Sequence, residues 1–201
     1  MCGGAVYVFA RWLARRTALR DFARAHALQY RGVLPSHKYV PYTQFYSIRS
    51  GVLLYNAMEG IWDGFAIALF DVPLRGGPGT SAIVTVPHDC TQFEVIPDAL
   101  NPPRTAIGQR SGNWSRVTLP HTDLPGVVVR EATEGSAAEA IGPRTVALIR
   151  DGLPARLETN CGYLLVNAVR VIAPDDLPGF LRFATAAARA LQADRDARYE
   201  A

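Results

Sequence analysis

Lysine is almost absent from the sequence: Lys38 is the only lysine among 21 basic side chains, and arginine supplies the rest. A GC-rich genome explains this bias more simply than selection for anion recognition, because arginine is special only at particular sites. Cysteine is scarce too, with Cys2, Cys90 and Cys161 making an odd number in a chain too large to depend on disulfides. We therefore expect free thiols and a reducing, cytoplasmic compartment. A disulfide between Cys90 and Cys161 stays an open alternative, because spacing does not determine connectivity.

A long apolar run is also missing. Apolar residues near the start of the chain extend only from Ala5 to Ala10, far fewer than the roughly 20 that a membrane-spanning helix needs. A secretory signal is excluded, because the segment has no basic beginning and no small-residue cleavage site. Arginines follow at once, as they do at the cytoplasmic flank of a membrane segment. This pattern predicts a basic amphipathic N-terminal segment over residues 1–16, close to a membrane, and a single α+β domain over residues 17–201.

Positive charge is concentrated in the first 31 residues, which carry six arginines against Asp21, a balance of +5. The net charge of the whole chain is +3, so the other 170 residues sum to −2. A basic segment on a near-neutral body predicts an anionic surface nearby, with membrane headgroups favoured over nucleic acid. No nucleic acid is expected as a partner, and the oligomeric state stays open. The residues predicted to face an anionic membrane surface or a protein partner are Arg11, Arg15, Arg16, Arg20 and Arg24.

Two segments repeat apolar residues at helical spacing, and each is predicted to lay its apolar stripe across a sheet. Gly32 follows the first stripe and predicts the end of that helix. The first stripe consists of Leu19, Phe22, Ala23, His26 and Tyr30. The second stripe, which begins after Asp176, consists of Leu177, Leu181, Ala184, Ala188 and Leu191.

The densest β-forming run extends from Gly51 to Leu74 and is typical of a hairpin, with turn residues between Glu59 and Gly64. Its second arm, FAIALFDV, is apolar until Asp71, as in a strand covered on both faces. Further strand patterns occur at residues 44–50, 81–86, 92–97, 114–119, 127–131, 155–159 and 163–171. We predict an α+β fold, a mainly antiparallel sheet of about seven or eight strands with the N-terminal and C-terminal helices packed on one face.

Candidate catalytic and metal-ligating residues are few. His88 and Cys90 flank Asp89 in the one local cluster that combines a nucleophile with a base, and alternate residues of an extended chain face the same side. A zinc site has the right ligand types in His88, Cys90, His121 and Cys161, but it lacks the paired spacing that places two ligands on one element. We expect no cofactor and no metal, and the sequence favours a protein that is not an enzyme.

The order of these landmarks resembles an uncharacterised family of bacterial proteins. The resemblance is carried by the first helical stripe, by glycine and aromatic positions in and after the hairpin, by a proline-broken helix in the middle of the chain, and by a closing helix rich in small residues. The positions in and after the hairpin are Gly51, Asn56, Glu59, Gly60, Gly64, Phe70, Asp71 and Gly162 to Leu165. Members of the family look like an N-terminal membrane segment followed by a soluble α+β domain, which implies attachment to a membrane. No catalytic residue is established for the family, so the resemblance implies none here.

The favoured function is a non-enzymatic interaction or scaffold module at the cytoplasmic face of a bacterial membrane, peripheral to its inner surface. Two alternatives stay open. One is binding of an apolar small ligand in a pocket between the sheet and the C-terminal helix, because such packing leaves cavities. The other is a thiol-dependent hydrolase that uses His88 and Cys90.

Overall fold

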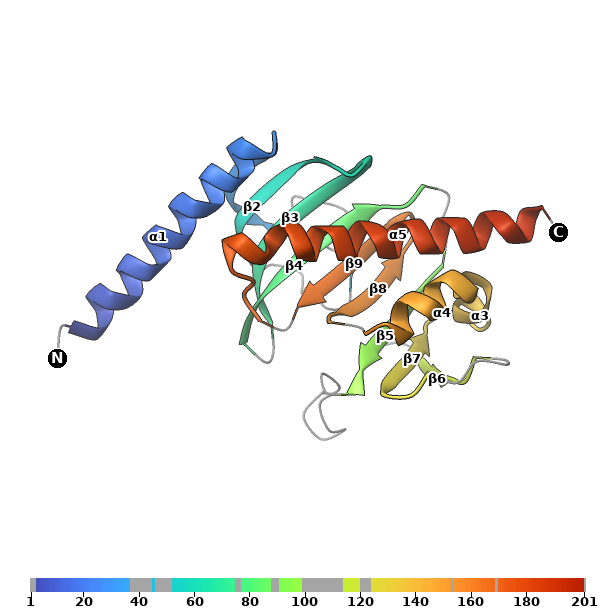
Figure 1. The fold of residues 1–201 in the computed structure, drawn as a ribbon. Helices are drawn as coiled ribbons and strands as arrows, with labels where there is room; N and C mark the ends of the chain where they lie inside the picture. The colour runs from blue at the N-terminus through green and yellow to red at the C-terminus, as the bar shows by residue number, and fades with distance from the viewer. Residues whose placement is uncertain are drawn as a thin grey trace.

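The computed structural model describes residues 3–36, 45, 52–74, 77–87, 91–98, 114–119, 124–152, 154–168 and 170–200, and their side chains except those of residues 3–11, 73–74 and 77–78. Within these residues, nine strands form a single antiparallel sheet in the order β1-β2-β3-β4-β9-β8-β5-β7-β6 (Figure 1). Long helices stand at both ends of the chain, α1 (Gly3–Ala25) and α5 (Leu177–Tyr199). The predicted α+β class and antiparallel sheet are therefore confirmed. Whether residues 1–16 form a separate unit stays a prediction, although α1 runs without a break through residues 16 and 17.

The other elements follow in chain order. The strands are β1 (Gln29–Pro35), β2 (Leu53–Trp62), β3 (Phe65–Leu74), β4 (Gly77–Thr85), β5 (Phe93–Pro97), β6 (Ser115–Val117), β7 (Val127–Glu131), β8 (Arg156–Asn160) and β9 (Tyr163–Ala168). The shorter helices are α3 (Ser136–Ala140), α4 (Pro143–Arg150) and the 3-10 helix η3 (Pro174–Asp176).

Strand β1 is an element that the sequence pattern did not predict. The apolar stripe suggested that the first helix continues to Tyr30, but α1 ends at Ala25, and Ala27 adopts a left-handed φ of 54°. Gly32 has a φ of 81° inside β1, where the register against β2 shifts, so it permits a bulge rather than ending a helix. The strand predicted over residues 44–50 lies outside the described residues, apart from residue 45. The described part of the sheet thus has nine strands instead of seven or eight.

The hairpin formed by β2 and β3 is tighter than expected. Its turn consists of Asp63 and Gly64, both with positive φ, at 50° and 84°. A two-residue turn in which both residues have positive φ matches the right-handed twist of the two strands that it joins. Glu59 and Gly60, predicted as turn residues, lie within β2 and pair with β3.

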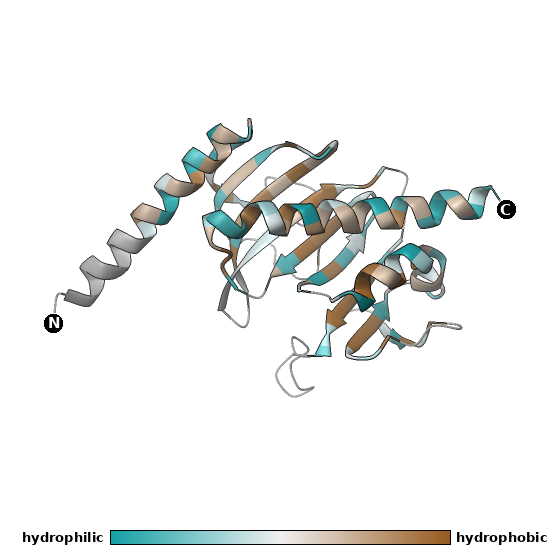
Figure 2. Cartoon of the chain, in the orientation of Figure 1, coloured by the Kyte–Doolittle hydropathy of each residue, from teal (hydrophilic) through white to brown (hydrophobic). Residues whose placement is uncertain are grey.

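Both long helices contribute to one buried cluster on the same face of the sheet. Figure 2 shows hydrophobic residues concentrated on the strands behind α5, while hydrophilic residues alternate along the helix itself. The α5 residues that are 0% exposed include Leu177, Leu181, Ala184, Ala187 and Ala188. Complete burial of each leucine contributes roughly 1.5–3 kcal/mol. The predicted stripe of the last helix is therefore confirmed, and it anchors α5 across the sheet.

The opposite face of the sheet is buried as well. Its apolar cluster consists of Phe45, Leu54, Ala57, Phe70, Val72, Ile83 and Leu165. The fully buried Glu94 of β5 forms ion pairs with Arg156 of β8 and with Arg130 of β7, the latter at 3.5 Å. A buried carboxylate requires such partners, because an isolated charge is costly to remove from water.

Asp194 of α5 caps the start of α4 from outside. Its carboxylate accepts hydrogen bonds from the backbone amides of Gly142, Arg144 and Thr145 at 3.1, 3.1 and 2.8 Å. These amides have no partner within α4, because the first turn of a helix leaves its N–H groups unsatisfied. An added Cβ at Gly142 would come within 2.6 Å of the Asp194 Cγ atom. One buried carboxylate therefore holds α4 against α5.

We expect Asp194→Ala to lower the free energy of unfolding by about 2 kcal/mol, because three backbone amides at the start of α4 lose their acceptor. The matched control is Asp196→Ala, an exposed acid on the same helix, for which the change should stay below about 0.5 kcal/mol. Urea denaturation followed by circular dichroism measures both. Equal effects of the two substitutions would contradict the capping role.

Candidate docking surface at the base of helix α1

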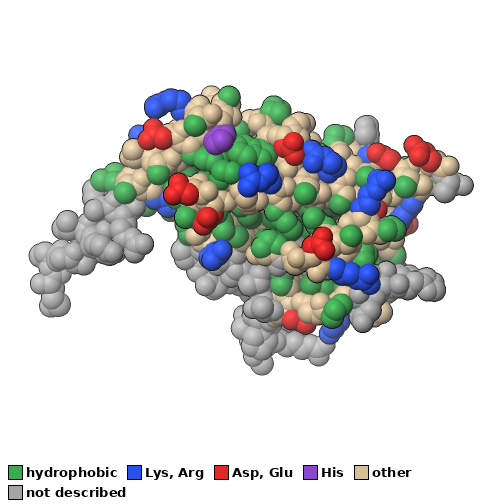
Figure 3. Space-filling model, viewed as in Figure 1, with side chains coloured by type: hydrophobic (Ala, Val, Ile, Leu, Met, Phe, Trp, Pro, Cys, Tyr) green, Lys and Arg blue, Asp and Glu red, His purple; other side chains and the backbone are tan. Residues whose placement is uncertain are grey.

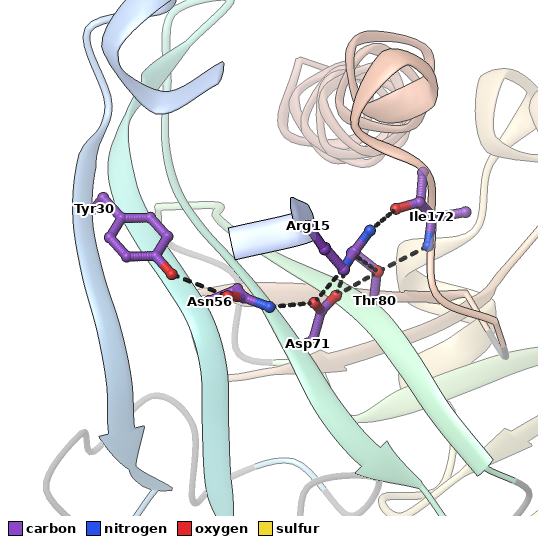
Figure 4. Close-up of polar contacts among 6 residues, drawn as sticks. All are labelled: Arg15, Tyr30, Asn56, Asp71, Thr80 and Ile172. Carbon is purple, nitrogen blue, oxygen red and sulfur yellow. Dashed lines mark hydrogen bonds and ion pairs between the residues drawn. The ribbon is translucent and has the colours of Figure 1, made fainter. Parts of the chain in front are cut away.

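Arg15 connects α1 to the sheet through an ion pair with Asp71 of β3 (Figure 4). Its Nε and Nη2 atoms donate to the two carboxylate oxygens of Asp71 at 2.9 and 2.8 Å, a bidentate geometry. Its Nη1 atom donates to the backbone oxygen of Ile172 at 2.7 Å. The two charged side chains are only 18% and 12% exposed. A single guanidinium therefore joins α1, β3 and the segment that leads into α5.

The Asp71 carboxylate is the centre of a wider polar network. It also accepts hydrogen bonds from the Thr80 hydroxyl at 2.7 Å and from the Asn56 amide at 2.9 Å. The Asn56 side-chain oxygen accepts a bond from the Tyr30 hydroxyl at 2.9 Å, and the Thr80 hydroxyl accepts one from the Ile172 amide at 3.0 Å. These donors supply the hydrogen-bond partners that a buried carboxylate requires. We call these six residues the Arg15–Asp71 network: Arg15, Tyr30, Asn56, Asp71, Thr80 and Ile172.

A bulge in β2 places Asn56 in this network. The register against β3 shifts between Tyr55 and Met58, and Asn56 has a left-handed φ of 52°. Asparagine tolerates this conformation better than most residues. Sequence reasoning missed the network, although one signal was available: Asp71 is the only acid in an otherwise apolar strand.

Two other arginines of α1 lie over aromatic rings. The guanidinium carbon of Arg16 is 5.4 Å from the ring centroid of Trp12, and that of Arg20 is 5.4 Å from the ring centroid of Tyr30. These are cation–π contacts, which hold an arginine in place without neutralising its charge. Arg16 and Arg20 therefore keep their positive charge available at the surface of α1.

The remaining arginines that the sequence assigned to an anionic surface have different surroundings. Arg24 is exposed and forms an ion pair with Asp21 at 3.2 Å. Arg15 is engaged with Asp71, as described above. The side chain of Arg11 lies outside the described residues. The structure thus brings Arg16 and Arg20 together on one helix and uses Arg15 to hold that helix in place.

Large hydrophobic side chains are exposed around the point where α1 leaves the sheet. Eight such side chains are exposed among the described residues, and two of them, Ile61 and Tyr199, lie at the tip of the β2–β3 hairpin and at the end of α5. The other six are 36–48% exposed, and we call them the apolar patch: Trp12, Leu13, Val33, Leu53, Tyr55 and Val171.

Strand register puts the sheet residues of this patch on the face that α1 crosses. Tyr55 is the register partner of Asp71, whose carboxylate contacts Arg15. Leu53 lies two residues before Tyr55 in the same strand and so points to the same side. Val33 precedes Leu34, the partner of Leu54, and is therefore level with Tyr55.

The other members of the patch adjoin Arg15. Trp12 and Leu13 lie within one turn before it on α1, and Val171 precedes Ile172, whose oxygen accepts its Nη1 hydrogen bond. Figure 1 shows the N-terminal part of α1 extending beyond the strands, away from the body of the sheet. The patch therefore combines side chains of α1 with side chains of the strands and of the segment that lie next to Arg15.

A second hydrophobic area lies at the other end of α1. Phe22 and His26 pack against each other and against Trp62 of β2, with ring centroids 4.5 to 6.0 Å apart. Figure 3 shows hydrophobic side chains gathered beside this histidine. Nearby, a hydrogen bond from Arg189 at 2.9 Å lowers the pKa of the exposed Asp63 carboxyl below its usual value. These contacts fix the hairpin tip between the two long helices.

The chemical candidates of the sequence are not brought together in what the structure describes. His88, Cys90 and His121 lie outside the described residues, so the thiol and zinc hypotheses stay predictions. Cys161 is described and is an exposed free thiol in the turn between β8 and β9. No group of three or more His, Cys, Asp or Glu side chains within the described ranges could hold a metal ion.

A cavity of about 320 Å³ lies between α3, the C-terminal half of α5 and the segment that follows β4. Val86, Ala140 and Leu191 contribute apolar surface to its lining, while Glu139 and Arg195 contribute charge. The cavity therefore adjoins one end of α5 and is both polar and apolar in character.

No helix in the described part of the chain is long and apolar enough to cross a membrane. Helix α1 has the length, but arginines interrupt its apolar character from residue 11 onward, and each is costly in a lipid environment. The resemblance to a family with an N-terminal membrane segment was therefore wrong.

No protein-family model matches the chain, and no curated protein matches it in sequence. Its fold is similar to that of a crystal structure of the mycobacterial trehalose monomycolate transport factor A, TtfA, with a TM-score of 0.67 over 88% of this chain and 94% of the other. The two sequences are 14% identical, so the similarity concerns the fold alone. A fold related to that of TtfA replaces the family that the sequence suggested.

We expect Arg15→Ala to lower the free energy of unfolding by about 3 kcal/mol, because it leaves the Asp71 carboxylate buried without its cation. Arg16→Ala, one residue further along α1, should change it by less than about 0.5 kcal/mol. Urea denaturation of both variants measures the difference. A small loss for Arg15→Ala, similar to that of its neighbour, would show that the network does not anchor α1.

Proposed function

We propose that this protein is a non-enzymatic docking module whose α1 binds the anionic surface at the cytoplasmic face of a bacterial membrane. The observation that carries the proposal is the exposure of Trp12 and Leu13 next to Arg16 and Arg20, on a helix that extends beyond the sheet. Helices that lie in a membrane interface combine residues in this way. Their apolar side chains enter the headgroup region, and their arginines contact anionic lipid.

The sequence that precedes Trp12 supports the same location for α1. Residues 5–10, AVYVFA, are apolar and belong to the helix, whose backbone begins at Gly3. Docking on a surface requires no membrane-spanning helix, and the proposal includes none. Asp175 and Asp176 lie on η3, which contacts α1, so the net charge of this end is smaller than the arginines alone suggest. Apolar contacts are therefore a necessary part of the proposed binding.

The similarity in fold to a protein named as a transport factor is compatible with this proposal. In the proposed function, the domain docked on the membrane serves as an interaction or scaffold partner for membrane proteins. Asp71, Glu94 and Asp194 are all engaged in structural contacts, which is compatible with a docking module. The hydrolase that would use His88 and Cys90 stays a prediction from the sequence.

The cavity beside α5 favours binding of a small ligand as a second candidate function. A volume of about 320 Å³ lies at the lower end of the range for ligand sites. The site does not extend along the middle of α5, because Leu181, Ala184 and Ala188 are fully buried against the sheet. Glu139 and Arg195 in its lining suit a ligand with polar groups better than a purely apolar one.

We expect the full chain to co-sediment with vesicles that contain phosphatidylglycerol and to bind phosphatidylcholine vesicles more weakly. Exchanging both Arg16 and Arg20 for alanine should weaken binding by roughly 30-fold, because each arginine near an anionic surface contributes about 1 kcal/mol. The matched control exchanges Arg116 and Arg144, two exposed arginines on β6 and α4. Equal losses in the two double variants would show that only the net charge matters and would remove the role of α1.

The apolar contribution has its own test. Leu13→Asp should reduce co-sedimentation with the same vesicles by about tenfold or more, because an exposed leucine can no longer enter the interface. Tyr199→Asp is the matched control, since Tyr199 is 84% exposed at the far end of α5. Both variants should unfold at the temperature of the wild type. Undiminished binding of Leu13→Asp would rule out an apolar contact through α1.

A further inference from the structure

We propose that the docking surface extends from α1 onto the sheet, with Leu53 and Tyr55 of β2 as a second contact with the bilayer, and that the Arg15–Asp71 network holds the two contacts in a fixed relation. This inference rests on the proposed function. It adds a binding surface to that function and assigns a positioning role to residues that do not touch the bilayer.

The exposed residues of the sheet carry the first part of the inference. Leu53 and Tyr55 are 44% and 36% exposed, and they lie on the side of the sheet that α1 crosses. Val33 extends this surface onto β1, the strand at the edge of the sheet. Apolar side chains gathered in one area mark a contact surface, whereas isolated ones are normal on any protein. Six of the eight exposed large hydrophobic side chains among the described residues lie in this one area.

Charge decides which partner this surface fits. Arg16 and Arg20 of α1 and the exposed Arg170 beside Val171 place positive charge around it, which outnumbers the two acids of η3, Asp175 and Asp176. A second copy of the chain on this surface would bring its own arginines close to these arginines, and like charges repel each other. An anionic bilayer supplies both the negative charge and the apolar interior that the surface requires.

The Arg15–Asp71 network carries the second part. Among the side chains of α1 from residue 12 onward, only Leu19 and Ala23 are fully buried, and both follow Arg15 in the chain. Arg15 joins α1 to Asp71 and to the Ile172 backbone (Figure 4), at a position two and three residues after Leu13 and Trp12. Loss of this contact would loosen the attachment of α1 relative to Leu53 and Tyr55. Two membrane contacts whose relative position is fixed bind a bilayer more tightly than two contacts that move independently.

The first experiment compares two identical substitutions in one strand. Leu53→Asp, at the start of β2, should reduce co-sedimentation of the full chain with phosphatidylglycerol vesicles by about tenfold. Ile61→Asp, near the other end of β2 and 64% exposed, should leave it unchanged. Both positions are on the surface, so both variants should fold. Equal binding of the two variants would overturn the sheet contact.

The second experiment separates positioning from charge. Asp71→Asn and Asp63→Asn each raise the net charge from +3 to +4, which by itself favours anionic vesicles. We expect Asp63→Asn to bind at least as well as the wild type. Asp71→Asn should bind about tenfold more weakly despite its added positive charge, because the two contacts lose their fixed relation. Tighter binding of Asp71→Asn would overturn the positioning role.

Hydrogen exchange supplies a readout that does not depend on vesicles. Asp71→Asn should speed exchange in α1 and at the Ile172 amide, which donates to Thr80, while exchange in β5 and β7 stays as in the wild type. Equally faster exchange throughout the chain would show that the network contributes only to overall stability, and it would overturn the positioning role. If the wild type does not bind vesicles, the proposed function and this inference both fail. If the wild type binds vesicles and the Leu53→Asp and Asp71→Asn variants bind them equally well, only this inference fails.

Discussion

The burial of one carboxylate, that of Asp71, determines how the N-terminal helix meets the sheet. A charge in this position is stable only when hydrogen-bond donors and a cation surround it. Arg15 supplies the cation, Asn56 and Thr80 supply further donors, and each comes from a different element. Because the same guanidinium also binds the backbone at Ile172, the segment leading into α5 is drawn to the same point. The direction of α1 follows from these contacts.

Hydrophobic burial and this polar network have different roles in the structure. Apolar residues and alanines of α5 lie fully buried against the sheet, so that helix is held along much of its length. Helix α1 buries fewer of its described side chains, and Trp12 and Leu13 stay partly in water. The hydrophobic effect does not depend on the orientation of the groups that it buries, whereas a bidentate ion pair requires a particular geometry. A helix held at one end by packing and by one ion pair can extend outward and offer its remaining surface to a partner.

Fold similarity and site chemistry contribute separately to the functional argument. The similarity to the structure of TtfA concerns the architecture alone, and unrelated functions occur on one architecture. The argument for docking therefore depends on particular side chains of this chain. Exposed apolar residues cluster where α1 leaves the sheet, and Glu94 and Asp194 make structural contacts elsewhere in the fold.

Local patterns in the sequence determined much of the architecture. The stripe from Leu177 to Leu191, the apolar run of β3 and the hairpin around Asp63 and Gly64 are features of neighbouring residues, and short-range periodicity is enough to predict them. The end of α1 was harder to predict, because Tyr30 continues the helical spacing of the stripe. Only the pairing of β1 with β2 shows that this residue belongs to a strand.

The candidate site depends on contacts that no local pattern contains. Arg15 and Asp71 are 56 positions apart, and Arg15 and Ile172 are 157 apart. The sequence by itself determined that the first helix is basic and that Asp71 ends an apolar run. Only the tertiary structure decided that Arg15 forms the ion pair that attaches the helix to the sheet, while Arg16 and Arg20 stay at the surface. The physical reason is that the surroundings of a charged side chain depend on which distant segments fold against it, and sequence spacing does not record them.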